Sequence, residues 1–414
     1  MKIHADLHIH GLYSMGTSKS MTFPVLAKEG KKKGLDLIAT GDALHSKWLK
    51  MIKEMRDLGN GIFEMDGMHF LLSCEVEDIK RVHHLLYFPE LSKVEEFREE
   101  VKKHSPNIDM DGRPNLYLNG EEIAQIAKDV GALIGPAHAF TPWTAIYAAH
   151  SSLEECYGDL TNYVSFLELG LSANTDYSDR ISSHHRLTYL SNSDSHSPYI
   201  TRIAREFNVI EIDELSFENI KKAILREDGQ KFVLNVGYPP QLGKYNESAC
   251  ISCYRHYTLR DAKIKRWSCS CGRTIKKGVA DRVNELADLE EPKHPPHRPP
   301  YINLLPLSKI IAKAIGQKSE TTKTVKQIWS SLVEYASNEI QVLLYTDIRD
   351  IKNLSNEKVA EAIQLFRENR IRIIAGGGGR YGDIELDAKE NIEEDKEDTI
   401  LWKKKKKRGQ QTLF

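Results

Sequence analysis

The sequence predicts an α/β protein in which a βα domain is followed by a small cysteine-rich segment and a mainly helical C-terminal region. Short apolar runs alternate with helical patterns up to about residue 237. Four of the six cysteines lie between residues 250 and 271, and helical periodicity dominates after residue 300. With 414 residues, the chain is long enough for about two to four domains of ordinary size.

The alternation in the first part of the chain consists of six apolar runs that are typical of buried strands. They are residues 36–40, 69–73, 85–88, 132–135, 164–167 and 187–190. The clearest helix spans residues 120–130, where Ile123 and Ile126 share one face and Gly131 follows the end. Because strands alternate with helices, the pattern favours parallel pairing in a βα barrel or an open α/β sheet.

Composition divides the chain into five segments. The predicted boundaries are 1–237 for the βα domain, 238–291 for a cysteine-rich basic domain, 292–300 for a linker, 301–386 for the helical domain and 387–414 for a flexible tail. The linker holds five prolines in nine residues, which excludes helix and sheet there. In the tail, an acidic block precedes the lysine run 403–407, which indicates disorder.

The charge balance and the hydropathy exclude two classes of protein. Lys and Arg number 58 and Asp and Glu 59, so a globally basic nucleic-acid-packaging protein is excluded. No run of about 18 apolar residues is present, and the first residues lack the apolar core of a secretion signal. We therefore expect a soluble cytoplasmic protein with no membrane contact.

Histidine and carboxylate side chains recur where the predicted strands end. His8 and His10 are two residues apart on an apolar run, so in a strand both point to the same face. The same residue types follow the other runs, namely Asp42, Glu75, His83 with His84, His138, Glu168, and Asp194 with His196. Surface histidines and capping carboxylates would explain any one of these elements, but they explain the whole set poorly.

The set also indicates its chemistry, because 13 of the 16 histidines lie in the first 200 residues. The ends of parallel strands meet on one face, so these side chains supply enough ligands for two or three metal ions. Divalent ions joined by a carboxylate lower the pKa of a bridging water and bind phosphate oxygens. The sequence therefore predicts a metal-dependent phosphoesterase.

These motifs resemble those of the PHP (polymerase and histidinol phosphatase) family, whose pattern runs D-x-H-x-H, T-D-H, x-E, H, H and D-x-H. The resemblance implies a PHP-type distorted seven-stranded βα barrel with a trinuclear site, commonly of zinc or manganese, with magnesium as a further candidate. The metal ligands that it implies are His8, His10, Asp42, Glu75, His83, His138, Asp194 and His196. Glu75 would be the bridging carboxylate, and we expect Asp194, Glu75, His8 and His10 to be catalytic.

The chain departs from the PHP pattern in two places. Residues 40–42 read Thr-Gly-Asp without the adjoining His, and the family's extra His after the first motif is missing. One metal would then be held more weakly. His84 adjoins His83, and strand alternation decides which of the two faces inward.

The four clustered cysteines form a second candidate metal site. Cys250 and Cys253 are separated by fifteen residues from Cys269 and Cys271. Two close pairs at this separation are typical of a structural zinc ribbon with a tetrahedral thiolate site. The second pair is C-x-C, which leaves His256 as an alternative ligand, and unligated core cysteines are the other interpretation.

Basic and aromatic residues surround these cysteines. Between residues 250 and 282, nine Arg or Lys stand against two Asp, with Tyr254, Tyr257 and Trp267 between them. Such a mixture suits phosphate contacts and base stacking, although a solvated charged face is the alternative. The predicted DNA-binding residues are Arg255, Arg260, Lys263, Lys265, Arg266, Trp267, Arg273, Lys276 and Lys277.

The order of a PHP barrel, a four-cysteine ribbon, a Pro-rich linker and a helical region is similar to that of the endonuclease Q family. The resemblance also rests on motifs at residues 6–10, 13–14, 17–21, 40–42, 82–86, 192–198 and 297–301. It implies a nucleoid-associated DNA repair endonuclease that recognises uracil, hypoxanthine, xanthine or abasic sites and cleaves the phosphodiester bond 5′ of the lesion. The alternatives are a PHP phosphatase or exonuclease acting on small phosphoesters or DNA ends, and a DNA-binding repair adaptor.

A pocket that distinguishes a deaminated base needs a donor for the new carbonyl oxygen and an acceptor for the ring N–H. We expect the base to be flipped out of the stack, and we predict that Gly11, Asn192 and Ser172 or Asn174 line its pocket, with capping or turn roles as the alternative. The glycine run 376–382 lacks the Lys-Ser/Thr of a nucleotide loop and does not indicate NTP binding.

The last residues of the chain are similar to the sliding-clamp peptide Q-x-x-L-x-x-F. Gln410, Leu413 and Phe414 would be the contact residues, and the peptide stops early relative to the full motif. A short apolar peptide at the end of a basic, flexible tail suits tethering to a clamp. We therefore predict the sliding clamp PCNA as a partner beside damaged DNA.

Overall fold

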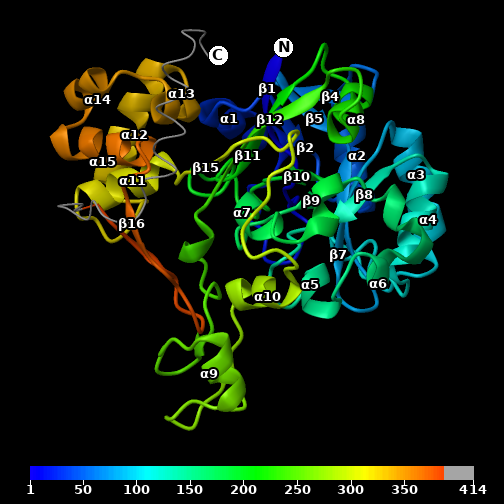
Figure 1. Cartoon of the computed structure of the whole chain (residues 1–414). Coiled ribbons are helices and arrows are strands. Elements are labelled where there is room, and N and C mark those ends of the chain that lie inside the picture. The colour runs from blue at the N-terminus through cyan, green and yellow to red at the C-terminus, as the bar shows by residue number, and fades with distance from the viewer. Residues whose placement is uncertain (387–414) are drawn as a thin grey trace.

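The computed structural model describes residues 1–386 and divides into three parts (Figure 1). A βα part formed mainly by residues 1–237 lies to the right in this view, a helical part whose helices span residues 307–367 lies to the left, and a small module around α9 lies below both. The predicted clamp-binding residues 410–414 lie outside the described residues.

The strands and helices are as follows. The strands are β1 (Lys2–Asp6), β2 (Leu37–Ala39), β3 (Arg56–Asp57), β4 (Ile62–Met65), β5 (Met68–Leu71), β6 (Ser73–Glu77), β7 (His83–Tyr87), β8 (Leu133–Pro136), β9 (Phe166–Glu168), β10 (Thr188–Leu190), β11 (Phe207–Glu211), β12 (Lys231–Gly237), β13 (Ala249–Cys250), β14 (Ile275–Lys276), β15 (Tyr301–Asn303), β16 (Arg372–Ile374) and β17 (Asp383–Glu385). The helices are α1 (Phe23–Lys33), α2 (Ser46–Lys53), α3 (Leu91–Lys102), α4 (Gly120–Asp129), α5 (Ile146–Ala149), α6 (Glu154–Tyr157), α7 (Thr175–Ser178), α8 (Phe217–Leu225), α9 (Leu259–Ile264), α10 (Val279–Leu286), α11 (Leu307–Ala314), α12 (Lys323–Ala336), α13 (Glu339–Leu344), α14 (Ile348–Leu354) and α15 (Glu357–Arg367), with short 3-10 turns at Gly158–Tyr163, Ser182–Arg186 and Pro240–Leu242.

The six predicted apolar runs overlap β2, β5, β7, β8, β9 and β10, and the predicted helix 120–130 is α4. Helix α4 begins with a capping box, in which the Asn119 side chain accepts from the Glu122 amide and the Glu122 carboxylate accepts from the Asn119 amide. Its buried face includes Ile123, Ala124 and Ala127, so the 3.6-residue period places these side chains in the core.

The α/β class is confirmed, but strand pairing is mixed. Parallel pairs join β1 to β2, β2 to β5 and β9 to β10. Strands β6, β7 and β8 are antiparallel, and the connection between β6 and β7 is a short turn in which Asp78 accepts from the amides of Lys80 and Val82. Among residues 1–237 the strands fall into separate sheets rather than one continuous ring, so a closed seven-stranded barrel is not confirmed.

Single backbone hydrogen bonds connect these sheets near the ends of the strands. The His10 amide donates to Ser195, the Ala43 amide to Ser73, and the Ala139 amide to Glu168, at 3.0, 3.2 and 2.8 Å. These bonds bring together the segments that follow β1, β2, β8 and β10. Most of the predicted metal ligands lie on or shortly after these strands, whereas Glu75 lies on β6 and His83 on β7.

The Pro-rich segment 292–300 lies against the βα part. Arg298 is buried, and its guanidinium pairs with Asp179 at 2.9 Å. The segment then continues into β15, which pairs with β12 in parallel. A buried ion pair between Lys33 of α1 and Glu339 of α13, at 2.5 Å, further attaches the helical part. Among residues 1–386, no helix is long and apolar enough to cross a membrane.

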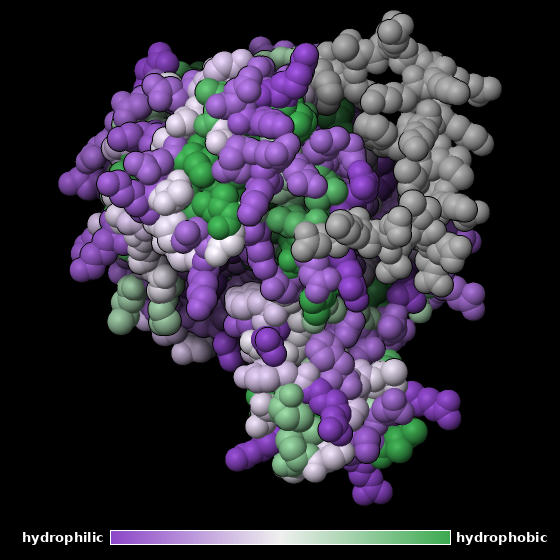
Figure 2. All heavy atoms as spheres, turned by 90° about the vertical axis from the view of Figure 1, so that its left-hand side faces the viewer, coloured by the Kyte–Doolittle hydropathy of each residue, from purple (hydrophilic) through white to green (hydrophobic). Residues whose placement is uncertain are grey.

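Residues 249–277 form the cysteine module. Its buried cluster contains Cys250, Ala262, Cys269 and Ile275, and it projects as a separate lobe below the rest of the molecule, with hydrophilic side chains at its edges (Figure 2). The chain between β16 and β17 extends from the helical part down to this module (Figure 1). It carries the glycine run 376–382.

Candidate metal centre

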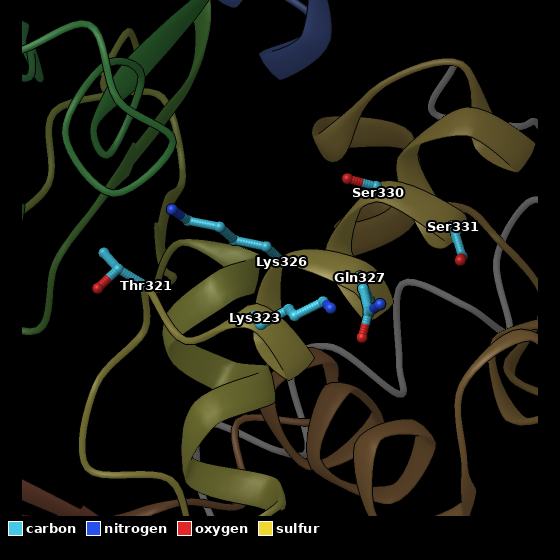
Figure 3. Close-up of a pocket in the computed structure, with 6 residues that line it drawn as sticks. All are labelled: Thr321, Lys323, Lys326, Gln327, Ser330 and Ser331. Carbon is cyan, nitrogen blue, oxygen red and sulfur yellow. The ribbon is translucent and has the colours of Figure 1, made fainter.

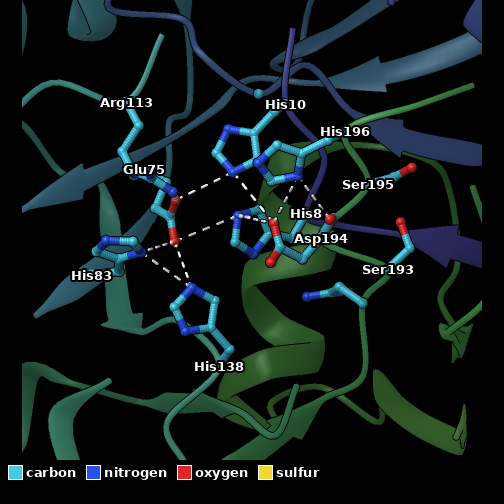
Figure 4. Close-up of polar contacts among 12 residues, drawn as sticks. His8, His10, Glu75, His83, Arg113, His138, Ser193, Asp194, Ser195 and His196 are labelled. Atoms are coloured by element: carbon cyan, nitrogen blue, oxygen red, sulfur yellow. Dashed lines mark hydrogen bonds and ion pairs between the residues drawn. The ribbon is translucent and has the colours of Figure 1, made fainter. Parts of the chain in front are cut away.

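Seven histidine and carboxylate side chains converge where the strands of the βα part end (Figure 4). The metal cluster, as we call this group, consists of His8, His10, Glu75, His83, His138, Asp194 and His196. Glu75 lies at its centre. One Glu75 oxygen is 2.9 Å from Nε2 of His138 and 3.0 Å from Nδ1 of His83, and the other is 3.2 Å from Nε2 of His10.

Four buried polar atoms of the metal cluster have no hydrogen-bond partner among the described residues. They are Nδ1 of His138 and three atoms that lie close together: Nε2 of His8, Nε2 of His10 and Oδ1 of Asp194. Asp194 Oδ1 is 3.3 Å from the His10 nitrogen and 3.8 Å from the His8 nitrogen. Leaving a buried polar atom unpaired costs on the order of 1–3 kcal/mol. The joint orientation of these atoms, together with an imidazole and carboxylate donor set, therefore fits a divalent cation.

Carboxylates behind the metal cluster fix its imidazole rings. Nδ1 of His8 is 3.0 Å from Glu168, and Nδ1 of His10 is 3.0 Å from Asp42. When Nδ1 carries the proton and donates it, Nε2 keeps its lone pair directed into the cluster. Glu168 also accepts from the His138 amide at 2.7 Å, so one carboxylate orients two of the predicted ligands.

The sequence predicts Asp42 as a metal ligand, but the structure places it behind His10. Its oxygens contact Nδ1 of His10, the Gly11 amide at 2.6 Å and the Ser14 hydroxyl at 2.8 Å. It is not among the groups that converge on the metal cluster. Asp42 therefore positions His10.

His83 faces the metal cluster, and the adjoining His84 faces the opposite side of β7. Nδ1 of His84 is 2.8 Å from the Tyr157 hydroxyl, and its Nε2 is 3.3 Å from Asp78. The second nitrogen of His83 contacts Glu77 at 3.0 Å. Strand alternation thus separates the two histidines, as the period of two requires.

Two of the residues predicted to line a base pocket are engaged by other partners. Asn192 is fully buried, and its amide accepts from the Leu7 amide at 3.0 Å and donates to Glu168 at 2.8 Å. The Gly11 amide donates to Asp42. Neither group is available to a base, whereas Ser172 is half-buried in the loop after β9.

The charges of the metal cluster are strongly coupled. Burial alone would lower the pKa of His8, but the carboxylates of Glu168 and Glu75 outweigh it and raise this pKa to about 9. Burial likewise opposes ionisation of Glu75, yet the charges of His83 and His8 hold its pKa well below the usual range. Glu75 is therefore ionised at neutral pH, and cation binding displaces imidazolium protons.

Arg113 is a site residue that the sequence analysis missed. Its Nη1 lies 3.2 Å from Glu75, and 27% of its side chain is exposed, so the guanidinium extends from the metal cluster to the surface. It comes from the loop between α3 and α4, which has no periodic pattern. No local signal in the sequence marks it.

The backbone is strained at three of the predicted ligands. Asp42, His138 and Asp194 have φ angles of 48°, 29° and 45°, in the left-handed region that side-chain-bearing residues rarely adopt. Such strain tends to persist at functional sites, where surrounding contacts enforce it. It supports the assignment of the metal cluster as the functional centre.

The four thiols of the cysteine module lie close enough to share one ion. Sγ of Cys250 is 3.5 Å from that of Cys271, and Sγ of Cys253 is 3.5 Å from that of Cys269. Metal–sulfur distances of about 2.3 Å in a tetrahedron give sulfur–sulfur distances of roughly 3.8 Å. His256 contacts Glu247 at 2.6 Å, and it is not among the groups that converge with the thiols.

The predicted DNA-binding residues lie on the surface of the cysteine module. The exposed ones are Arg255, Arg260, Lys263, Lys265, Arg266 and Arg273. Lys263 and Lys277 pair with Glu285 at 3.3 and 2.8 Å, and Lys277 also lies over the Trp267 ring. Lys276 lies over the ring of Trp143, which belongs to the βα part.

A shallow hollow on α12 is a different kind of surface (Figure 3). It is lined by Thr321, Lys323, Lys326, Gln327, Ser330 and Ser331. This lining contains no imidazole, thiol or carboxylate. The hollow therefore lacks the donors of a catalytic centre.

The chain is similar to solved structures over nearly its full length. The lesion-specific endonuclease PfuEndoQ from Pyrococcus furiosus has 49% sequence identity and a TM-score of 0.90, with 95% of this chain and 98% of that chain covered. A structure of endonuclease Q in complex with a 27-mer duplex substrate, with an abasic lesion at the active site, has 49% identity and a TM-score of 0.88, with 95% and 99% covered.

Two further similarities concern parts of the chain. Residues 306–370 match the family described as MJ0043 C-terminal domain. The protein MJ0043 of Methanocaldococcus jannaschii is 45% identical over 253 residues, which are 60% of this chain and 31% of that protein. The chain thus spans about a third of that relative's length.

Proposed function

The chain belongs to the endonuclease Q family, and we propose that it recognises uracil, hypoxanthine, xanthine and abasic sites in DNA and cleaves the phosphodiester bond 5′ of the lesion. Membership of this family makes the chain a metal-dependent phosphodiesterase, which agrees with the prediction from the strand-end motifs. The observation that carries the proposal is the convergence of unpartnered, buried donors of His8, His10 and Asp194.

The metal cluster provides the donors for the active-site ions. We assign His8, His10, His83, His138, His196 and Asp194 as ligands, and Glu75, which belongs to two of the converging donor groups, would be a further ligand. When bound, divalent ions supply charge that neutralises phosphate oxygens and lower the pKa of an attacking water. Imidazole and carboxylate donors suit zinc or manganese, with magnesium as a third candidate, and the four thiols of the cysteine module suit zinc.

Other residues of the chain orient this centre and the phosphate. Glu168 and Asp42 hold the His8 and His10 rings by hydrogen bonds to Nδ1. Arg113 reaches the surface beside Glu75, where its guanidinium can donate to a non-bridging phosphate oxygen. The partner of the chain is damaged DNA, and the basic cysteine module suits contacts with its backbone.

Ser172 is the proposed reader of a deaminated base. Its hydroxyl can donate to the new carbonyl oxygen and accept from the ring N–H, as a discriminating group must. A flipped nucleotide reaches such a group, and a damaged pair is the cheaper one to open. Tethering to PCNA through Gln410, Leu413 and Phe414 is a further part of this proposal and rests on the sequence alone.

The test is a cleavage assay with end-labelled duplexes that carry one uracil, hypoxanthine, xanthine or abasic site, or no lesion. We expect one nick on the 5′ side of each lesion and none in the undamaged duplex. Asp194→Asn should abolish the nick, whereas the exposed Asp129→Asn on α4 should leave it unchanged. Equal degradation of all duplexes would instead support a general PHP nuclease. Binding without cleavage would support the alternative of a DNA-binding repair adaptor.

A further inference from the structure

Aromatic rings and lysines from three distant segments meet between the βα part and the cysteine module. Trp143 follows β8, Lys244 and Tyr245 precede β13, and Lys276 belongs to β14. The Trp143 and Tyr245 rings are 6.5 Å apart in an edge arrangement, and Lys276 Nζ lies 3.1 Å from the centre of the Trp143 ring. Lys244 Nζ lies 5.2 Å from the Tyr245 ring.

A fourth segment, the glycine run 376–382, adds Tyr381 to the row formed by Trp143, Tyr245, Lys244 and Lys276. The Gly379 amide donates to Lys244 at 2.9 Å, and the Glu247 amide donates to Gly376 at 3.0 Å. At Gly378, whose φ is 64°, a Cβ would lie 2.3 Å from the Cys250 carbonyl oxygen, so only glycine allows this approach. The docked loop places Tyr381 5.9 Å from Lys244 Nζ.

Two of the three aromatic side chains, Trp143 and Tyr381, are largely open to solvent, and Tyr245 is half-buried. Trp143 is 60% exposed and Tyr381 is 70% exposed. Trp143 also has a φ of 90°, which is a strained conformation for a bulky residue. Packing does not explain why an exposed Trp143 ring is kept in a strained backbone conformation. Strained backbone conformations of this kind occur at ligand-binding sites.

The row begins at the edge of the metal cluster. Trp143 is five residues after His138, and the loop that carries it is bonded at both sides to cluster segments. The Thr141 amide donates to the His138 carbonyl at 2.8 Å, and the His83 amide donates to the Thr144 carbonyl at 3.0 Å. The loop that carries Trp143 is therefore attached to two ligand-bearing segments of the metal cluster.

We propose that Trp143, Tyr245 and Tyr381, with Lys244 and Lys276, form a stacking platform for unpaired nucleobases of DNA bound at the metal cluster. Base faces stack on exposed rings whatever the sequence, and the lysines that lie over these rings add positive charge for the phosphates. Among the described residues, Lys244 and Lys276 lie over aromatic rings and pair with no carboxylate, so both charges are available to a polyanion. The inference rests on the proposed function, since it assumes DNA at the metal cluster.

The experiment measures binding of duplexes that carry an abasic site and a single 2-aminopurine, placed opposite the lesion or at either of the two flanking positions on each side. Asp194→Asn protein is used so that no cleavage occurs. Stacking should quench 2-aminopurine fluorescence at one or more positions. In this background, Trp143→Ala should remove that quenching and weaken binding roughly 5- to 150-fold, the range for loss of one stacked base.

Three further variants make the result specific. Trp143→Phe keeps a ring and should retain most of the quenching. Tyr335→Ala removes an exposed ring of α12 outside the platform and should change nothing. Lys276→Gln should lower the slope of log affinity against log salt by about one, as loss of one phosphate contact does.

The outcomes separate this inference from the proposed function. If Trp143→Ala keeps its melting temperature, its affinity and the quenching at every position, the platform does not exist, whether or not the wild-type protein nicks DNA. If quenching depends on Trp143 but wild-type protein never nicks a lesion, the platform stands and the cleavage proposal fails.

Discussion

The metal cluster and the cysteine module hold their donors in opposite ways. In the metal cluster, the exposed fractions of His8, His10 and Glu75 are 1% or less, and carboxylates behind the rings fix their orientation. In the cysteine module, Cys253 and Cys271 are exposed, and little apolar surface is buried beneath them. We therefore expect the βα part to keep its site folded without a metal, and the cysteine module to need a bound metal in order to fold.

The sharpest test of this difference removes one thiol. Cys253→Ala should abolish the ordered module while residues 1–237 stay folded, because structural zinc contributes on the order of 10–16 kcal/mol to folding of such modules. The expected result is loss of one zinc equivalent together with new protease cleavage within residues 249–277. The matched variant Ser252→Ala should keep both the zinc and the protease resistance.

Retention of the full zinc content by Cys253→Ala would contradict the comparison, since it would mean that the remaining ligands and packing suffice. Unfolding of the whole chain in Cys253→Ala would also contradict the comparison. It would show that the βα part depends on the module for its stability.

A second test concerns the residues behind the metal cluster. Asn192→Ala removes the partners of the Leu7 amide and of the Asn208 side chain, so we expect the free energy of unfolding to fall by about 1–3 kcal/mol. Cleavage of uracil, hypoxanthine and abasic duplexes should decrease by a common factor. Ser172→Ala, in contrast, should change the ratio of rates between lesions without a loss of stability.

These two variants are compared by urea unfolding and by rates measured on each duplex under the same conditions. An altered lesion preference in Asn192→Ala, with stability unchanged, would show that Asn192 does line the base pocket. Identical lesion ratios in Ser172→Ala and the wild-type protein would remove Ser172 from it.

The third test weakens the carboxylate behind His8. Glu168→Gln keeps the shape of the side chain but lowers its ability to accept from Nδ1 of His8, and such changes typically reduce metal affinity about 10- to 100-fold. We expect a higher concentration of manganese or zinc for half-maximal cleavage, with the zinc content of the cysteine module unchanged. Glu218→Gln, at an exposed position of α8, serves as the control. An unchanged metal requirement would show that His8 does not need this partner.

The sequence predicted the local features of both regions well, because their signals are short-range. The thiols of Cys250, Cys253, Cys269 and Cys271 converge as their spacing indicates. The six apolar runs overlap strands, since a buried strand needs only a few consecutive apolar residues. The direction of pairing was harder to predict, because β6 and β7 form a turn through Asp78 that the apolar pattern does not record.

Long-range placement explains what the sequence analysis missed at the site. Asp42 and Asp194 both follow strands, and only the fold puts one behind His10 and the other into the metal cluster. Arg113, Trp143 and Tyr381 come from loops without periodicity. Their importance depends on neighbours far away in the chain, so no local motif marks them.

The smallest expected effect concerns the segment 292–300, which leads from α10 to β15 and contacts the βα part. His294 pairs with Asp176 and Asp179, and these hydrogen bonds raise its pKa to about 9 although burial opposes the shift. A raised pKa stabilises the folded state fully below the unfolded value of about 6.5, and this contribution disappears as the pH rises through 9. Because 45% of the side chain is exposed, solvent screening limits it to less than about 1 kcal/mol. His294→Gln should therefore be slightly less stable than the wild-type protein in urea at pH 6 and equally stable at pH 10, and a difference that is the same at both pH values would show that the segment docks without this charge.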